Sequence, residues 1–451
     1  MPDLKMSSKH FSPAKSLVLS FLLLIIVGMV LLAMPFSAHY HVSILDALFT
    51  ATSATCVTGL VVFDTGSHWT ITGQWIILLL IQFGGLGIMT FSTLGALIIA
   101  GRLNLRSREL MEGSLSGRPL PNLGKLIYYI VFGTLFVEFS GAALLFTRFH
   151  HDHTVFHAIY LSLFHSISAF CNAGFSLFSD SLVHYQQDAV VNYTIMGLII
   201  VGGIGFWVLY DLVKVMQVRT RKLCLHSRVV LYATATLILV GTLSLLIFEW
   251  GNVLSGLPFF YKMTGAMFQS VTARTAGFNT VPIEAMTNSS LLMLVMLMLV
   301  GASPGSCGGG IKTTTMAVIG AMIFSRIKNE QQVRIFNRGL PEKVVSKAIG
   351  ITFFALLILI AAIMILLISE HPGGPHVEGR TLFLEVVFEA FSALGTVGLS
   401  MGLTPVLSFT GKIVIIFLMF VGRVGPLTIA LAIAGRQNLR IRLAEEELWV
   451  G

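Results

Sequence analysis

The stretch DALFTATSATCVTGL, residues 46–60, joins a short apolar helix to a turn of small residues that contains Gly59. The apolar piece at 43–54 is too short to cross ~30 Å of hydrocarbon, which needs about 20 helical residues. Longer apolar runs precede it at 16–36 and follow it at 73–100. We therefore expect a re-entrant half-helix between two spans, which a membrane tolerates only where it lines a cavity or is buried in protein.

The same plan recurs three more times. The other short pieces lie at 154–170, 260–273 and 381–394. They are flanked by long apolar runs at 124–147 and 190–213, 228–250 and 289–325, and 345–369 and 411–434. Each short piece leads into a turn, and the four turns read TCVTGL (55–60), FCNAGF (170–175), RTAGFN (274–279) and GTVGLS (395–400). Their glycines, Gly59, Gly174, Gly277 and Gly398, are 115, 103 and 121 residues apart, which indicates an internal repeat.

A second glycine motif repeats inside each final span. It reads FGGLG (83–87), VGGIG (201–205), SPGSCGGG (303–310) and VGRVG (421–425). Glycines in an apolar helix usually allow close helix packing. Because the four units share one membrane orientation, the sequence predicts an all-α polytopic membrane protein with four parallel M1–pore-loop–M2 repeats around a central pore.

Composition and charge support a membrane protein. Of the 451 residues 55% are hydrophobic and only 11% are charged, against roughly 25% charged in soluble proteins. Of the 29 Lys and Arg, 22 lie in clusters at 5–15, 102–125, 214–228, 326–347 and 436–442. These clusters alternate with segments that hold few, so the positive-inside pattern places them, and both termini, in the cytoplasm. The basic surface favours anionic lipid over nucleic acid as its partner.

The expected organisation follows from these boundaries. It comprises a cytoplasmic N-terminus (1–15), repeats 1 (16–105), 2 (120–215), 3 (227–326) and 4 (344–435), and a cytoplasmic C-terminal tail (436–451). The first apolar run lacks a cleavage site and is expected to be retained. The four cysteines form no CxxC pair and predict no disulfide framework.

The four turns suit a dehydrated cation. Backbone carbonyls can replace its water, glycine permits the dihedrals that turn them inward, and each half-helix would point its negative C-terminal end at the axis. Without a carboxylate ring, a monovalent ion is favoured. The candidate filter residues are Thr55, Cys56, Val57, Thr58, Gly59, Cys171, Asn172, Ala173, Gly174, Arg274, Thr275, Ala276, Gly277, Gly395, Thr396, Val397 and Gly398. Thr55, Thr58, Asn172, Thr275 and Thr396 are expected to brace the turns. The alternative is a set of tight external turns.

Residues 302–313 interrupt the last span of repeat 3 and predict an intramembrane gating loop. A phosphate-binding loop is excluded because Ile311 separates the glycines from the lysine and no strand precedes them. Non-helical backbone at this depth should face a water-filled cavity. The candidate gate residues are Ser303, Pro304, Gly305, Ser306, Gly308, Gly309, Gly310, Lys312, Thr313 and Arg423. Arg423 is an ionisable residue in mid-span. It either holds the loop carbonyls and repels cations, or it has the structural role of hydrogen-bonding to backbone carbonyls that a helix break leaves without partners. Lys312 either joins the gate or snorkels toward the cytoplasm.

Acidic residues of the external loops either enrich cations at the mouth or are ordinary loop residues: Asp64, Asp152, Asp180, Asp188, Glu284, Glu370 and Glu378. The run HHDH (150–153) fits a loop histidine cluster better than a metal site. Cys56 and Cys171 are expected to be small packing residues.

With the four turns, GGGIKTTT (308–315) and GRVGPLT (422–428), the chain resembles the KtrB/TrkH superfamily of potassium uptake proteins, from residue 46 through 430. It is closer to the KtrB branch because one span precedes the first half-helix. The resemblance implies a potassium-translocating subunit of the bacterial plasma (inner) membrane, built like a potassium channel, that acts as a homodimer on a cytoplasmic nucleotide-binding ring (KtrA-like, of RCK/KTN type). By this resemblance, the filter of the family corresponds to the four turn glycines and its gating loop to Ala302–Thr313. Its pore-facing arginine corresponds to Arg423. Pro304 and Cys307 depart from relatives whose loop is richer in serine and threonine.

No covalent cofactor is expected. K⁺ is the expected transported ion, and a sodium dependence stays open. Any nucleotide is expected to act through the partner subunit, because the longest cytoplasmic segment of this chain is too short to form a sensing domain. The basic clusters and the tail 436–451 are candidate contact surfaces. Two other classes of protein fit less well. A membrane enzyme would need convergent catalytic groups, which this sequence does not show. A secondary transporter often has inverted repeats, whereas these four repeats are parallel. A sodium-permeable channel or transporter remains the alternative ion pathway.

Overall fold

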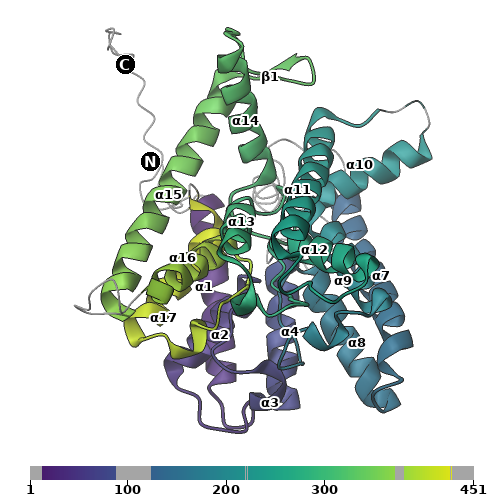
Figure 1. Cartoon of the computed structure of the whole chain (residues 1–451), viewed down its shortest axis with the longest axis vertical. Coiled ribbons are helices and arrows are strands. Elements are labelled where there is room, and N and C mark those ends of the chain that lie inside the picture. Colours follow the sequence, from purple (N-terminus) through teal and green to yellow (C-terminus); the bar gives the residue numbers. More distant parts are fainter. Residues whose placement is uncertain are drawn as a thin grey trace, which may run out of the picture.

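The computed structural model of the chain describes residues 13–87, 123–218, 220, 222–370, 380–426 and 428. Most of the predicted basic clusters at 5–15 and 102–125, the end of the apolar run at 73–100, Glu378 and the tail 436–451 lie outside the described residues. The described part is almost entirely helical, and Figure 1 shows a bundle from which α14 and a small hairpin project at the end opposite α3.

The helices follow the predicted order within each repeat. Repeat 1 holds α1 (Pro13–Leu32), α2 (Ile44–Thr55), α3 (Thr65–His68) and α4 (Ile71–Leu86). Repeat 2 holds α7 (Leu123–Phe149), α8 (Val155–Phe170), η1 (Val183–Tyr185), α9 (Ala189–Ile204) and α10 (Phe206–Gln217). Repeat 3 holds α11 (Leu225–Glu249), α12 (Phe259–Thr272), η2 (Ile283–Ala285), α13 (Asn288–Leu299) and α14 (Thr313–Ile327). The antiparallel strands β1 (Arg334–Ile335) and β2 (Arg338–Gly339) connect it to repeat 4, which holds α15 (Glu342–Glu370), α16 (Arg380–Gly395), η3 (Thr404–Val406) and α17 (Phe409–Val424).

The first helix of each repeat, α1, α7, α11 or α15, contains a segment that is long and apolar enough to cross a membrane. Their outward faces carry exposed apolar side chains such as Leu23, Phe136 and Ile360, the second of which is 74% exposed. A soluble protein rarely leaves such broad apolar surface uncovered, so these faces suit contact with lipid tails.

Three of the four second long helices end at a glycine of the second motif, and the fourth, α13, ends at Leu299, just before the interruption of that span. Gly87, Gly205 and Gly425 have φ values of +84°, +103° and +92°, which end α4, α9 and α17. The prediction of one continuous span over 190–213 is therefore wrong: α9 and α10 meet at a bend of 97°. The apolar pattern continues through the break, which is why hydropathy does not reveal it.

The repeats pack in a closed cycle. The second long helix of each repeat contacts the half-helix of the next, so that α4 lies on α8, α9 on α12, α13 on α16, and α17 on α2. An ion pair of 2.7 Å between Lys412 on α17 and Asp46 on α2 joins the last repeat to the first. Four parallel units therefore surround one centre, as the spacing of the turns predicted.

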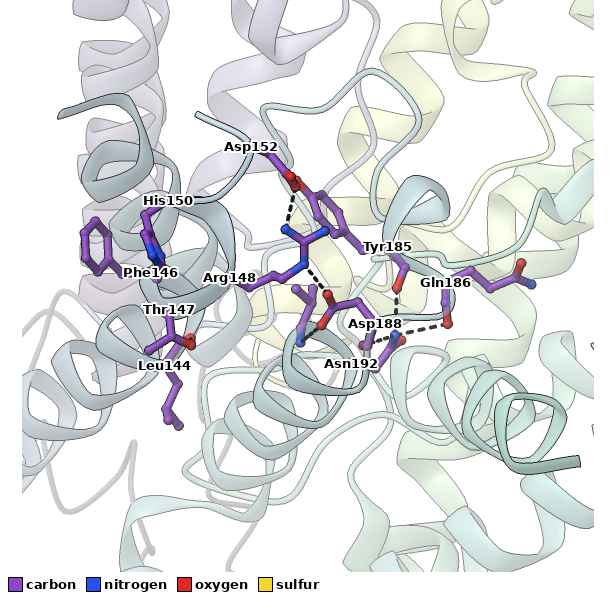
Figure 2. Close-up of polar contacts among 11 residues, drawn as sticks. Leu144, Phe146, Thr147, Arg148, His150, Asp152, Tyr185, Gln186, Asp188 and Asn192 are labelled. Carbon is purple, nitrogen blue, oxygen red and sulfur yellow. Dashed lines mark hydrogen bonds and ion pairs between the residues drawn. The ribbon is translucent and has the colours of Figure 1, made fainter. Parts of the chain in front are cut away.

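Polar contacts join the end of each first span to the start of the second. In repeats 3 and 4, Glu249 and Glu370 accept hydrogen bonds from the backbone N–H and hydroxyl of Thr287 and Ser408, the N-caps of α13 and α17. In repeat 2 the arrangement uses an ion pair. Arg148 lies between Asp188, the N-cap of α9, at 2.5 Å, and Asp152 at 2.8 Å (Figure 2).

Arg148 holds the pKa of the Asp152 carboxyl below its ordinary value of 3.8, chiefly through their hydrogen bond. A carboxyl whose pKa is lower in the folded chain stabilises it above the unfolded value and loses that contribution as pH falls through the folded pKa. Because both side chains are about one third exposed, we expect Asp152→Asn to lower the melting temperature by no more than about 2 °C at pH 7. Thermal melts in detergent check this, and a deficit that does not shrink as the pH is lowered below 3.8 would contradict it.

Candidate functional site: the glycine turns and the intramembrane loop

The four turns share one unusual backbone pattern. The residue two positions before each glycine has a left-handed φ: +57° at Val57, +60° at Asn172, +69° at Thr275 and +50° at Thr396. The glycines follow with φ values of +94° at Gly59, +70° at Gly174, +80° at Gly277 and +91° at Gly398. Side chains other than glycine rarely adopt this region, so its recurrence in four places indicates a shared and constrained conformation.

The glycines of the four turns contact one another in a ring. A methyl group built on Gly59 would lie 2.4 Å from the carbonyl oxygen of Ala173, next to Gly174. From Gly174 it would lie 2.7 Å from the oxygen of Ala276, from Gly277 2.5 Å from that of Val397, and from Gly398 2.1 Å from that of Thr58. The last contact returns to the first turn. The turns therefore close around one axis, and a side chain at any of these glycines would strike the backbone of its neighbour.

Hydroxyl groups on the half-helices hold the turns. Ser53 and Ser392 accept hydrogen bonds from the N–H groups of Gly59 and Gly398 at 3.1 and 3.0 Å. Ser168 and Thr272 donate to the carbonyls of Phe175 and Phe278 at 2.8 and 2.6 Å. These four hydroxyls are absent from the predicted braces, although the sequence carries a signal for them. A hydroxyl lies six residues before the glycine in repeats 1, 2 and 4, and five before it in repeat 3.

The predicted braces behave differently from one another. The hydroxyls of Thr55 and Thr58 have no hydrogen-bond partner among the described residues, so the expectation that they brace the first turn is wrong. Asn172 and Thr275 link the turns of repeats 2 and 3 at 3.2 Å. Thr396 accepts a hydrogen bond from Gly309 of the intramembrane loop at 3.0 Å rather than bracing its own turn.

The remaining predicted filter residues are all in or beside the turns. Arg274 differs from the others because its guanidinium points to α11, where it donates to Thr234 at 3.3 Å. Gly395 packs against Met298 and the loop glycine Gly310. Among these remaining residues, the side chains of Cys56, Val57, Cys171, Ala173, Ala276 and Val397 are fully buried.

The second glycine motif receives the carbonyl end of each half-helix in three repeats. A methyl group on Gly84, Gly202 or Gly422 would lie 2.0, 1.8 or 2.1 Å from the carbonyl oxygens of Thr55, Phe170 and Leu394. Only a residue without a side chain fits there. In repeat 3 the intramembrane loop occupies the corresponding part of the span.

The intramembrane loop, residues 300–312, is a compact structure with its own hydrogen bonds. Gly301 donates to Ile311 at 2.8 Å and Ala302 donates to Gly309 at 3.2 Å. The hydroxyls of Ser303 and Thr313 lie 3.0 Å apart, and that of Ser306 donates to the Ser303 carbonyl at 2.7 Å. The ends of the loop are therefore held together where α13 stops and α14 starts.

The loop is also attached to its neighbours. Ser303 and Cys307 donate their N–H groups to the carbonyls of Gly203 and Gly202 in repeat 2, both at 3.1 Å. The carbonyl of Gly305 accepts from Phe206 at 2.9 Å, directly after the bend between α9 and α10, and Pro304 packs against Gly205.

On the side of repeats 3 and 4 the loop glycines lie against the turns themselves. Gly310 donates to the carbonyl of Gly422 at 3.1 Å. Methyl groups built on Gly308 and Gly309 would lie 2.1 and 2.4 Å from the hydroxyls of Thr275 and Thr396. The loop therefore sits directly against two of the four glycine turns.

Arg423 ties the loop to the opposite side of the ring. From α17 its guanidinium donates to the carbonyl of Cys307 in the loop and to those of Gly84 and Gly85 on α4. One side chain of repeat 4 thus connects repeats 1 and 3. Lys312 donates to the loop carbonyl of Gly308 at 2.8 Å, so its ammonium group turns into the loop instead of extending away from it.

The acidic residues of the loops that are expected to be external mostly carry structural contacts. Asp64 caps α3, Asp180 accepts from the N–H of His184, and Asp152, Asp188 and Glu370 have the contacts described above. These carboxylates therefore help to hold the loops together. The described residues contain no group of three or more His, Cys, Asp and Glu that could hold a metal ion, and this includes the HHDH run.

Comparison with known proteins agrees with this architecture. Residues 15–438 match the family model of TrkH, described as a cation transport protein. The chain is 39% identical to the Ktr system potassium uptake protein B of Bacillus subtilis over 98% of its own length and 97% of the relative, and 38% identical to that of Vibrio alginolyticus over 100% and 98%. It is 36% identical to the potassium/sodium uptake protein NtpJ of Enterococcus hirae over 98% of both chains.

A solved structure shares the fold. The crystal structure of the potassium transporter TrkH from Vibrio parahaemolyticus superposes with a TM-score of 0.70 at 18% identity, covering 96% of this chain and 87% of that one. The closed cycle of four repeats, the ring of glycine turns and the match over almost the whole length lead to one conclusion: this chain belongs to the TrkH family of cation transport proteins.

Proposed function

We propose that this chain is the potassium-translocating membrane subunit of a bacterial uptake system, and that potassium passes through the ring formed by Gly59, Gly174, Gly277 and Gly398. The observation that carries this proposal is the closed contact of the four turns around one axis. The names of the relatives, potassium uptake proteins and a potassium/sodium uptake protein, supply the ion.

The chemistry of the ring suits an alkali cation. The N–H groups of Gly59 and Gly398 are bonded to serines on their half-helices, which leaves peptide carbonyls as the polar groups for an ion. Each half-helix ends within a few residues of its glycine, so its partial negative charge lies close to the axis. An uncharged ring of oxygens compensates a monovalent ion for its water without binding it too tightly to leave.

The intramembrane loop and Arg423 form the gate in this proposal. The loop lies against the turns of repeats 3 and 4, and Arg423 connects it to α4. Together they place a positive charge and a compact piece of backbone beside the ring. Opening requires the loop to leave Thr396 and Gly422 and the guanidinium to release Cys307.

The proposed assembly is a homodimer in the bacterial plasma membrane with both termini in the cytoplasm. A nucleotide-binding ring of KtrA-like subunits would supply regulation, which agrees with relatives named as components of a Ktr system. The hairpin β1–β2 and the basic residues around it project from the bundle (Figure 1) and offer a surface on that side. The family is one of transporters, so no catalytic chemistry is assigned to the chain.

The test is ion flux in proteoliposomes that contain only the purified chain. We expect an imposed potassium gradient to drive potassium entry without any organic substrate, and excess sodium to compete weakly. Equal entry of both ions would replace the proposal by a sodium-permeable pathway, and no flux of either ion would reject it. Adding sodium at fixed potassium tests the sodium dependence directly.

A further inference from the structure

Glu389 is a fully buried carboxylate directly behind one of the glycine turns. It lies on α16, nine residues before Gly398, and none of its side chain is exposed. One carboxylate oxygen accepts a hydrogen bond from the hydroxyl of Ser400 at 2.9 Å, and the other accepts one from Thr404. Ser400 follows Gly398 by two residues and Thr404 by six, so Glu389 connects the helix that enters the turn to the segment that leaves it.

The leaving segment depends on these contacts for its path. It runs from Gly398 to the start of α17 and contains little regular structure beyond η3. The hydroxyl of Ser400 donates to Glu389 and accepts from the N–H of Gly402 at 3.0 Å, where φ is +93°. Through its hydrogen bonds to Ser400 and Thr404, Glu389 thus holds both ends of the tight bend around Gly402.

The same position on the half-helix anchors the turns of two other repeats. His165, nine residues before Gly174, lies 3.0 Å from the hydroxyl of Ser176, which follows that glycine by two residues. Gln269 donates to Thr280 at 3.4 Å in repeat 3, where the turn is one residue shorter. Both side chains are buried. Three of the four repeats therefore tie their leaving segment to the half-helix through one long polar side chain.

The three anchors differ in the hydrogen-bonding groups that they offer to the leaving segment. Nδ1 of His165 donates to the carbonyl of Leu161, and Nε2 accepts from the N–H of Leu177 at 3.4 Å, so the ring is in a neutral form. Gln269 is also neutral, and its Oε1 has no partner in the described part of the chain. Glu389 alone of the three offers two carboxyl oxygens, each of which accepts a hydrogen bond from a different hydroxyl group.

We propose that Glu389 is a positioning residue for ion selection, an inference that rests on the proposed potassium pathway. A ring of carbonyls that resists closing around the smaller sodium ion prefers the larger potassium ion. Gly398 contacts Thr58 and closes the ring, so the anchor behind it sets how far that quarter can move inward. Loss of the anchor softens the ring and reduces the preference for potassium.

The experiment measures the sodium concentration that halves potassium uptake, divided by the KM for potassium, in proteoliposomes. This ratio is independent of the amount of active protein. We expect Glu389→Leu, which keeps the volume but removes both acceptors, to lower the ratio at least about tenfold. Glu389→Gln should lower it less, because the amide oxygen still accepts one hydroxyl hydrogen.

Two further variants separate positioning from general damage. Glu249→Leu removes another buried, hydrogen-bonded carboxylate, at the outer end of α11 and far along the chain from any turn; it should reduce stability but leave the ratio unchanged. Ser400→Ala with Thr404→Val removes the two donors. It should reproduce the effect of Glu389→Leu, and combining it with Glu389→Leu should add little.

The outcomes distinguish this inference from the function on which it rests. Suppose that the wild-type chain moves potassium selectively. If Glu389→Leu then keeps the wild-type ratio, the positioning role is overturned and the potassium pathway stands. Where the leucine variant does not fold, the Ser400→Ala and Thr404→Val pair is judged in the same way. Full additivity of the two changes also overturns it. A wild-type chain that moves no potassium overturns both.

Discussion

Replacing Gly398 by serine is expected to reduce strongly the preference for potassium over sodium. The new Cβ would lie 2.1 Å from the carbonyl oxygen of Thr58, a distance at which the backbone of the first turn must shift. The φ of +91° adds strain for any side chain, typically about 1–2 kcal/mol. If the shift of that backbone changes the relative binding of the two ions by about 1.4 kcal/mol, selectivity changes tenfold, so we expect the selectivity ratio to fall by about tenfold or more.

Gly256→Ser is the matched control for this change. Gly256 has a comparable φ of +77°, but a Cβ there would meet no atom within 4 Å. Competition uptake of potassium against sodium should therefore separate backbone strain alone from damage to the ring. Serine variants of Gly59, Gly174 and Gly277 should resemble Gly398→Ser. Wild-type discrimination in all four would refute the assignment of the ring as the filter.

Removal of the intramembrane loop is expected to increase potassium flux. Deleting Ser303–Gly310 removes the backbone that lies against the turns, and Thr396 and Gly422 lose their hydrogen bonds to the loop. The path beside the ring would then stay open. Initial uptake velocity per molecule of protein, measured at saturating potassium, is the relevant quantity, and a folded deletion variant with unchanged velocity would count against a gate.

Arg423→Gln tests the same gate without a deletion. Its guanidinium donates to carbonyls of Cys307, Gly84 and Gly85, and hydrogen bonds to charged groups contribute about 1.5–3 kcal/mol each. Losing them should shift the loop toward the open form by about tenfold or more. Lys412→Gln is the control, because it removes a charge from the same helix where it pairs with Asp46 instead of the loop. Equal velocities for the two variants would contradict the role of Arg423.

The half-helices could be predicted closely from the sequence. The pieces expected at 154–170 and 260–273 correspond to Val155–Phe170 and Phe259–Thr272. Two local signals bound them: apolar runs too short to span, and small-residue turns with a glycine that needs a positive φ. Both depend only on neighbouring residues, which is why one sequence suffices.

The second spans could not be predicted as well. Residues 190–213 form one apolar run in the sequence, yet the chain bends by 97° at Gly205. The bend depends on packing against another repeat, since Pro304 of the loop lies against that glycine. Hydropathy records which side chains avoid water and is insensitive to such a contact.

Some site residues could be predicted from the sequence, but their contacts could not, because those contacts join residues that are far apart in the chain. Arg423 is conspicuous because a charge within an apolar span is visible in the sequence alone. Its acceptors belong to residues 116 and more than 330 positions away, and no local pattern identifies them. The sequence favours Thr55 and Thr58 as braces over the serines that hold the turns, because only the folded path of each turn decides which hydroxyl reaches its backbone.

The most direct test is the anomalous scattering of rubidium, a close analogue of potassium, in crystals of the protein soaked with its salt. We predict a peak on the axis between Gly59, Gly174, Gly277 and Gly398, within coordination distance of their turn carbonyls, that excess potassium removes. Rubidium bound only away from that axis, with the turns intact and the axis empty, would contradict the proposed pathway.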